Sequence, residues 1–282
     1  MEGNNQTSVT EFILLGFSGF SQAQFPLFVV FVSAYAGALV GNISIITLIR
    51  VCHTLHTPMY FFLVNLSLLD ICTITAIIPQ MLLNLMDEKK TISFQCCLTQ
   101  AYFFVIFLAT ELLLLAVMAF DRYVAICQPL RYTVIMSQKV CSYLVIGTWV
   151  LGILLANVHV LSVLRLSFCG PSTINHFFCE LPPLLQLSFS YIYIVSSILK
   201  IQSVQGKKKA FSTCSSHLIV VTLFYSSVIY TYVRPPSMYL DMDKIVAVLY
   251  TVITPILNPL IYSLRNKEVK EAFKKFVRLD RN

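Results

Sequence analysis

The sequence predicts an all-α integral membrane protein, a seven-transmembrane helix bundle with a shortened fifth helix and a C-terminal amphipathic helix. Of the 282 residues, 57% are hydrophobic and only 12% are charged, at a mean hydropathy of +0.77. A soluble domain of this length needs far more charge to cover its surface. Apolar runs of roughly 20 residues, the length that crosses a bilayer core, recur along the chain. Residues 1–282 are therefore expected to form a single membrane domain, with no room for a second, soluble domain.

The first four spans are clear from these apolar runs. We predict them over about Pro26–Ile49, Pro58–Leu85, Leu98–Ile126 and Val140–Leu164. The 25 residues before the first span contain no Lys or Arg and no clear small-residue cleavage site, so no cleavable signal peptide is visible. We expect the first span to act as its own insertion signal.

The fifth apolar stretch, Leu184–Leu199, is barely long enough to cross and is interrupted by Gln186, Ser188 and Ser190. A thin span, a re-entrant piece and a damaged helix all remain open for it. If the stretch does not cross, everything after it is inverted and the basic cluster Lys207–Lys209 lies outside. The charge distribution disfavours that outcome, so we predict a short or deformed fifth span.

The sixth span is predicted over about Phe211–Tyr232 and the seventh over about Ile245–Leu264. Residues 265–282 form a cytoplasmic tail, in which Val269 and Phe273 fall at helical spacing among lysines. Such a pattern is typical of an amphipathic helix that lies on the lipids of the inner leaflet.

Charge selects the orientation of the bundle. With residues 1–25 outside, fifteen of the twenty Lys and Arg residues lie in cytoplasmic segments and five lie outside. The net charge of +7 therefore reflects topology and does not indicate a nucleic-acid partner. We expect a multi-pass protein of the plasma membrane with an extracellular N-terminus, in which Asn5-Gln6-Thr7 is a glycosylation acceptor at Asn5.

Two carboxyl groups, those of Asp70 and Glu111, lie deep within the second and third spans. An ionised group at membrane depth costs at least ~2.5–3.5 kcal/mol, so both must be neutral, paired or bound to an ion. A protonated, hydrogen-bonded pair that merely packs the bundle and a proton or cation path of a transporter both remain open.

Two further patterns stand at the cytoplasmic ends of spans. Asp121-Arg122-Tyr123 places a charged pair at the end of the third span, where Arg122 pairs with Asp121 or extends to the interface as an anchor. In the seventh span, Asn258-Pro259 predicts a kink that frees backbone carbonyls for neighbouring groups or water.

Four runs together resemble the signature motifs of olfactory receptors, which are G-protein-coupled receptors of the rhodopsin class. They occur in the order of the family and at the expected ends of the expected helices. The runs are Pro58-Met59-Tyr60 with Asn65-Leu66-Ser67 and Asp70, then Met118–Cys127, Lys209–Leu218 and Pro255–Asn266.

The resemblance implies roles for particular residues. The switch that a G protein reads would comprise Asp121, Arg122, Tyr123, Tyr191, Asn258, Pro259 and Tyr262. A hydrated cluster that often holds sodium would comprise Asn42, Asp70, Glu111 and Asn258. The ligand-binding wall would comprise Phe104, Val105, Leu108, Tyr225, Val228, Tyr232, Val248 and Thr251, although ordinary packing explains each of these residues as well. A disulfide would join Cys97, at the start of the third span, to Cys179 in the long outer loop, a pairing that is also sensible in the secretory pathway.

The chain departs from the family next to Phe189. Leu184–Ser188 matches the end of the outer loop and Ser190–Ile194 matches the cytoplasmic half of the fifth span, with only Phe189 between them. We therefore predict a deletion on the order of one transmembrane length, roughly 20 residues. Because Phe189 stands where the family has a second loop cysteine, Cys169 is expected to lack its partner.

The expected function is that of an odorant receptor, which binds a small, volatile, mainly apolar ligand and activates a heterotrimeric G protein of the olfactory stimulatory type. A receptor remnant that no longer signals, because its fifth helix is incomplete, remains an alternative. A transporter is less favoured, since neither internal repeats nor paired broken helices are visible. No enzyme motif is found, and no cofactor is expected other than a sodium ion near Asp70.

Overall fold

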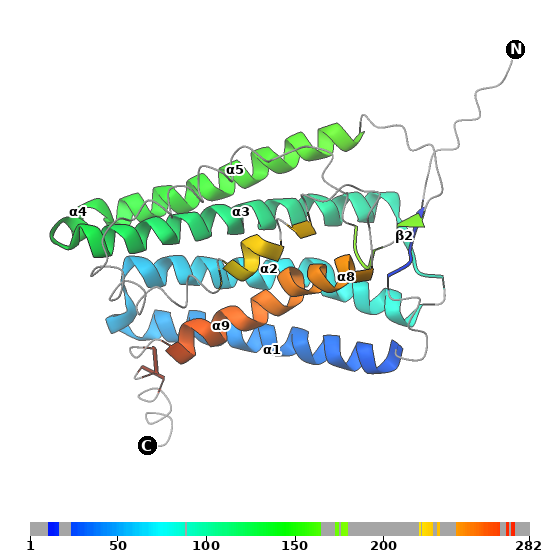
Figure 1. Ribbon diagram of the computed structural model, residues 1–282, viewed down its shortest axis with the longest axis horizontal. Helices are drawn as coiled ribbons and strands as arrows, with labels where there is room; N and C mark the ends of the chain where they lie inside the picture. Colours follow the sequence, from blue (N-terminus) through cyan, green and yellow to red (C-terminus); the bar gives the residue numbers. More distant parts are fainter. Residues whose placement is uncertain are drawn as a thin grey trace, which may run out of the picture.

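The computed structural model describes residues 11–16, 24–87, 89–164, 173–174, 176–179, 220, 222–227, 230–231, 241–265, 269–270 and 272–273. The described helices form a bundle of long elements that run side by side, with a small sheet at one end and the short helix α4 (Tyr132–Ile135) at the other (Figure 1).

Four helices confirm the first four predicted spans. They are α1 (Gln24–Val51), α2 (Pro58–Met86), α3 (Phe94–Cys127) and α5 (Gln138–Leu164). α1 packs on α2, α2 on α3 and α3 on α5, so that α2 and α3 are central. α3 begins earlier than predicted because Ser93 caps it, its Oγ accepting a hydrogen bond from the Cys96 amide at 3.2 Å.

The seventh span consists of α8 (Asp241–Val248), the π-helical turn η5 (Leu249–Ile253) and α9 (Thr254–Arg265). Pro259 lies inside α9, so the kink expected there stays a prediction, and an additional, unpredicted π turn lies before Pro255. Pro255 has no N–H to donate, and a π turn is a common way to accommodate such a break in the hydrogen-bond ladder. The Thr254 hydroxyl bridges the turn by donating to the Leu249 carbonyl at 3.0 Å.

The remaining spans are described in part. Residues 222–227 and 230–231 are helical and fall within the predicted sixth span. Residues 269–270 and 272–273 are helical as well, with Val269 and Ala272 buried and Phe273 exposed, as expected for an amphipathic tail. The predicted fifth span, residues 184–199, and the cluster Lys207–Lys209 lie outside the described residues.

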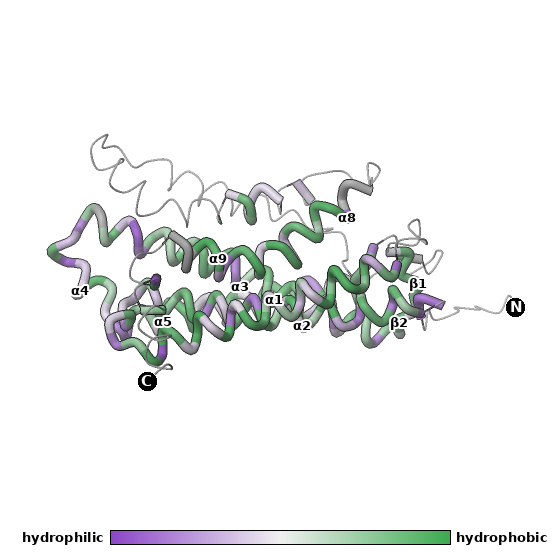
Figure 2. The backbone as a smooth tube through the Cα atoms, turned by 90° about the horizontal axis from the view of Figure 1, so that it is seen from below, coloured by the Kyte–Doolittle hydropathy of each residue, from purple (hydrophilic) through white to green (hydrophobic). Residues whose placement is uncertain are grey.

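Hydrophobic residues continue along the full length of the helices, and hydrophilic residues gather toward the ends of the bundle (Figure 2). Large apolar side chains are exposed in the middle of the outer helices, such as Val40 on α1 and Ile146 on α5, which are 65% and 57% exposed. Outward-facing apolar side chains at mid-helix are what lipid contact requires. Five helical segments of the described residues, including 244–261, are long and apolar enough to cross a membrane.

A three-stranded sheet closes the end of the bundle opposite α4. β1 (Glu11–Leu14) pairs antiparallel with β2 (Thr91–Ser93) and parallel with β3 (Thr173–Ile174), in the order β2-β1-β3. Phe12 and Leu14 alternate inward and pack near the disulfide between Cys97 and Cys179, whose Cα atoms are 5.3 Å apart. The disulfide confirms the predicted pairing, whereas this sheet was not predicted from the sequence.

Candidate functional site

A cluster of buried polar side chains joins α1, α2 and α9 at the centre of the bundle. Asn258 Nδ2 donates to both carboxylate oxygens of Asp70 at 3.0 Å. Asn42 Nδ2 donates to the Ala38 carbonyl at 3.0 Å and to the Pro255 carbonyl at 2.9 Å. The second bond satisfies the carbonyl that Pro259 leaves free, because a proline at position i+4 has no N–H. The predicted release of backbone carbonyls in this span is therefore confirmed, and Asn42 is one group that compensates for it.

Glu111 of α3 faces the same cluster. Its side chain is buried within electrostatic range of Asp70. Within the described part of the chain, Glu111 Oε1, Asn42 Oδ1 and Asn258 Oδ1 have no hydrogen-bond partner. Buried polar atoms are almost always satisfied, so each of these oxygens requires a proton donor, a water molecule or a cation. The donor set consists of oxygens only, which is the set that hard cations prefer.

At the end of α3 nearest to α4, Asp121 binds two partners with its two carboxylate oxygens. Arg122 Nε donates to Oδ2 at 2.9 Å, and Arg122 Nη2 forms an ion pair with the same oxygen. The hydroxyl of Tyr132, on α4 (Tyr132–Ile135), donates to Oδ1 at 2.7 Å. Burial and the neighbouring Asp121 raise the pKa of Tyr132, so its hydroxyl remains a donor. Tyr123, by contrast, is 41% exposed.

Tyr132 was missed by the sequence analysis. The only signal for it is an aromatic residue shortly after the Asp121-Arg122-Tyr123 motif, following the 3-10 turn η3 (Pro129–Arg131). Many aromatic residues of this chain stand near helix ends, so that signal alone does not single it out.

Some residues of the predicted ligand wall lie together near the outer end of the bundle. Phe104 of α3 is buried against Phe178 of the outer loop and Tyr250 of η5, at ring-centroid distances of 4.9 and 6.4 Å. Thr251 is fully buried and donates to the Ala247 carbonyl at 2.6 Å. Tyr225 of the sixth span donates to the Leu112 carbonyl of α3 at 2.8 Å.

The other predicted wall residues vary in position. Val105, Leu108 and Val248 are half-buried. Phe178 and Tyr250 were missed, because an aromatic residue in a loop or an apolar span gives no sequence signal distinct from packing. Asn5, Tyr191, Val228 and Tyr232 lie outside the described residues, as does the side chain of Tyr262.

His176 follows β3, and its backbone carbonyl accepts a hydrogen bond from the Gly16 amide at 3.1 Å. Its ring stacks on Phe177 at 4.5 Å and meets Phe178 edge-on at 4.7 Å. Burial, with the nearby charge of Lys244, lowers the pKa of His176 to about 3. The imidazole is therefore neutral at physiological pH.

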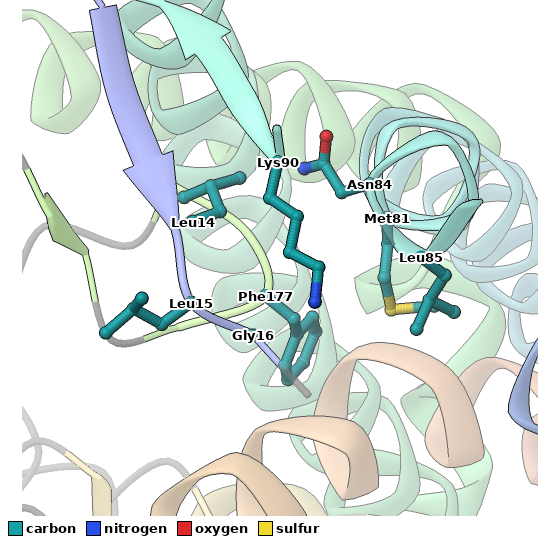
Figure 3. A pocket seen from close by; sticks show the side chains of 8 residues that line it. All are labelled: Leu14, Leu15, Gly16, Met81, Asn84, Leu85, Lys90 and Phe177. Carbon is teal, nitrogen blue, oxygen red and sulfur yellow. The ribbon is translucent and has the colours of Figure 1, made fainter. Parts of the chain in front are cut away.

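A small cavity of about 20 Å³ lies beside His176, between β1 and the outer end of α2. Figure 3 shows the Lys90 side chain extending along it toward Phe177. This volume is enough for about one water molecule. The cavity is lined by Leu14, Leu15, Gly16, Met81, Asn84, Leu85, Lys90 and Phe177.

The fold and the two polar sites agree with one class of protein. The family model of the 7 transmembrane receptor (rhodopsin family) matches residues 41–262. This chain therefore belongs to the rhodopsin family of seven-transmembrane receptors.

Curated relatives define the branch within that family. Human "Olfactory receptor 8G1" is 45% identical, with 98% of both chains covered. Mouse "Olfactory receptor 5M5" is 45% identical over 99% of this chain and 96% of its own length, and human "Olfactory receptor 5I1" is 46% identical over 97% and 96%. Within the rhodopsin family, the chain belongs to the olfactory receptors and is a receptor, not an enzyme.

The lengths of the alignments are relevant to the predicted deletion in the fifth helix. The comparison with Olfactory receptor 8G1 extends over 305 positions, whereas this chain has 282 residues. The relative therefore contains residues that have no counterpart here, in agreement with an internal deletion. The predicted place of that deletion, next to Phe189, lies outside the described residues. Nothing in the comparisons favours a non-signalling remnant or a transporter.

Proposed function

We propose that this odorant receptor binds small, mainly apolar ligands near Phe104 and Thr251 and signals through a stimulatory G protein of the olfactory type. The observation that carries the proposal is the near full-length similarity to olfactory receptors, combined with an Asp121-Arg122 pair that occupies the cytoplasmic end of α3. The outer end provides the ligand contacts and the opposite end provides the switch.

The side chains at the outer end support a neutral ligand. Phe104, Leu108 and Val248 are apolar, and the Thr251 hydroxyl is engaged with the helix backbone. A charged ligand would need a counter-charge in this low-dielectric region, and none of these residues provides one. Val228 and Tyr232 complete the proposed wall.

The proposed switch is the set of bonds around Asp121. While Asp121 binds Arg122 and Tyr132, the guanidinium is held against its own helix and is not available to a partner. A ligand that favours a second arrangement of the bundle shifts the population toward release of Arg122. Tyr123, Tyr191, Asn258, Pro259 and Tyr262 belong to the same proposed switch.

The experiment uses cells that express the receptor with a stimulatory olfactory G protein. An odorant panel is expected to raise cyclic AMP in cells with the intact chain, and the response is expected to be lost in Arg122→Ala. Arg131→Ala, in the adjacent turn η3, is the matched control and is expected to respond. A full response of Arg122→Ala at equal surface expression would contradict the role given to Arg122.

We also propose that the buried polar cluster holds a sodium ion, with Asp70, Asn42, Asn258 and Glu111 as its oxygen donors. The unpartnered oxygens of the last three residues support this proposal. A bound cation would neutralise the carboxylate charge of Asp70 in the low-dielectric interior of the bundle. Replacing potassium by sodium is expected to raise the melting temperature of the purified receptor, and Asp70→Asn is expected to remove that difference.

The proposed location is the plasma membrane, with residues 1–25 outside the cell and Asn5 glycosylated. The disulfide between Cys97 and Cys179 supports this orientation, because disulfides persist in the secretory pathway and outside the cell. The amphipathic tail at the opposite end is proposed to lie on inner-leaflet lipids.

A further inference from the structure

A groove of about 760 Å³ lies between the outer halves of α2 and α3, on the outside of the bundle and apart from the proposed odorant site. It is lined from α2 by Cys72, Thr75 and Gln80 and from α3 by Cys96, Thr99 and Phe103, together with their neighbours; we name it the lateral groove. Thr75, Cys96 and Thr99 are exposed, and Phe103 is 45% exposed, so the lateral groove opens away from the helix bundle.

The length of the lateral groove matches one leaflet of a bilayer. On α3 it extends from Gln95 to Phe107. At 1.5 Å per residue this stretch measures about 18 Å. Half of a hydrocarbon core of about 30 Å is about 15 Å. A groove of this length fits a lipid of the outer leaflet.

The polar side chains of the lateral groove are most numerous in its outer part. Gln80, Gln95, Cys96, Thr99 and Gln100 lie there, whereas Cys72 and Thr75 lie further toward the membrane centre, and none of the residues that line the groove is charged. A head group that fits there is small and uncharged, such as a hydroxyl, because a phosphate would find no counter-charge.

The part of the lateral groove nearest to the membrane centre is lined by a flat aromatic wall. Phe103 and Phe107 stack at a centroid distance of 6.0 Å and an interplanar angle of 26°. Trp149 of α5 meets Phe107 edge-on at 6.3 Å and supports the wall from behind. A rigid, flat hydrocarbon covers such a wall without losing the conformational entropy that a flexible acyl chain would lose.

We propose that the lateral groove binds a sterol of the outer leaflet, with its hydroxyl between Gln80 and Thr99 and its ring system on Phe103 and Phe107. The proposal does not depend on the odorant response, because the groove lies outside the proposed ligand wall.

The native thiol of Cys96, which is exposed on the rim, reports occupancy directly. The full-length receptor is placed in phosphatidylcholine nanodiscs with or without cholesterol, and alkylation by a soluble maleimide is followed by mass spectrometry. Cholesterol at about ten times its dissociation constant is expected to slow alkylation of Cys96 about tenfold, by mass action. Cys127, exposed at the other end of α3, is the internal control and is expected to react at an unchanged rate.

Two further comparisons, one of sterols and one of receptor variants, test the proposal. Cholestane, which lacks the hydroxyl, is expected to protect Cys96 much less than cholesterol does. Phe103→Ala is expected to abolish protection, whereas Phe25→Ala, a 69% exposed phenylalanine of α1, is expected to retain it. Equal alkylation of Cys96 with and without cholesterol, or equal protection by cholestane, would overturn the proposal, and both outcomes are measured on the unmodified chain.

Discussion

Tyr132 connects the short helix α4 to the charged pair at the end of α3. Its hydroxyl donates to the same carboxylate that binds Arg122. The bond therefore stabilises the arrangement in which Arg122 is paired with Asp121.

Removing this hydroxyl is expected to raise basal signalling. A hydrogen bond contributes about 1 kcal/mol, so Tyr132→Phe is expected to increase ligand-independent cyclic AMP about fivefold. Tyr143→Phe is the control, since Tyr143 is 72% exposed on the lipid side of α5. Basal cyclic AMP in Tyr132→Phe no higher than in the control would show that the bond does not restrain the switch.

His176 makes the outer end sensitive to acid. Its pKa is about 3 in the folded receptor and 6.5 in its ordinary state, so an unfolded chain binds a proton that the folded chain does not bind between these values. The stabilising contribution of the neutral ring is present above pH 6.5 and is lost as the pH falls toward 3. Protonation would also bring a positive charge near Lys244.

The melting temperature of the purified receptor is therefore expected to fall between pH 7.5 and pH 5. His176→Gln, which does not titrate there, is expected to show a smaller fall over the same interval. Parallel pH curves for the two proteins would show that His176 is not the responsible group.

At the scale of elements, the contact between α3 and α5 depends on a glycine. A Cβ atom on Gly152 would come within 3.0 Å of the Ile106 carbonyl and still closer to the Thr110 hydroxyl. Both atoms belong to the central helix α3, and a backbone carbonyl does not move aside as a flexible side chain does. Gly152 therefore permits the close approach of the two helices.

Gly152→Ala is expected to destabilise the receptor by about 1–3 kcal/mol, the cost of overpacking a close-packed interface. Gly147→Ala is the matched control on the same helix, because a Cβ atom there meets nothing within 4 Å. The control is expected to melt at the wild-type temperature or slightly above it, since Ala favours a helix over Gly. Equal melting temperatures for the two variants would contradict this account of the interface.

The sequence predicts the long helices well and the short elements poorly. α1, α2, α3 and α5 end within four residues of their predicted limits, because length and hydrophobicity alone determine a membrane span. The two-to-four-residue strands and the π turn η5 were not predicted, since they depend on pairing with distant segments or on relief of local geometry.

The site was predicted to a similar degree. The family resemblance implied that Asp70 and Asn258 lie together, and the Asp121-Arg122 pair was expected from the charged motif itself, because charged groups are rare and costly in a membrane. Tyr132 and Phe178 were not expected, because a single aromatic residue in a loop has the same sequence signature whether it packs, binds or restrains.

At the scale of the whole molecule, the two ends of the bundle are chemically distinct. One end carries the disulfide and the sheet, and the other carries α4 and the Asp121-Arg122 pair (Figure 1). The family has seven spans, an odd number, so the two chain termini are expected on opposite sides of the membrane.

Epitope tags at Met1 and Asn282 test this topology together with the shortened fifth span. In intact cells only the tag at Met1 is expected to bind antibody, and permeabilisation is expected to expose the other. Mature sugar at Asn5 is the expected sign of delivery to the surface. Both tags on one side would show that the fifth stretch does not cross.

The strand β1 stands near the beginning of the chain, yet its neighbour β3 is made only after four spans, since Ile13 pairs with Thr173. During synthesis β1 therefore keeps one edge unpaired until α1 through α5 have been made. Closure of the sheet is thus expected late in biogenesis, and pairing of β1 with β3 would distinguish chains with a completed sheet from chains still being inserted.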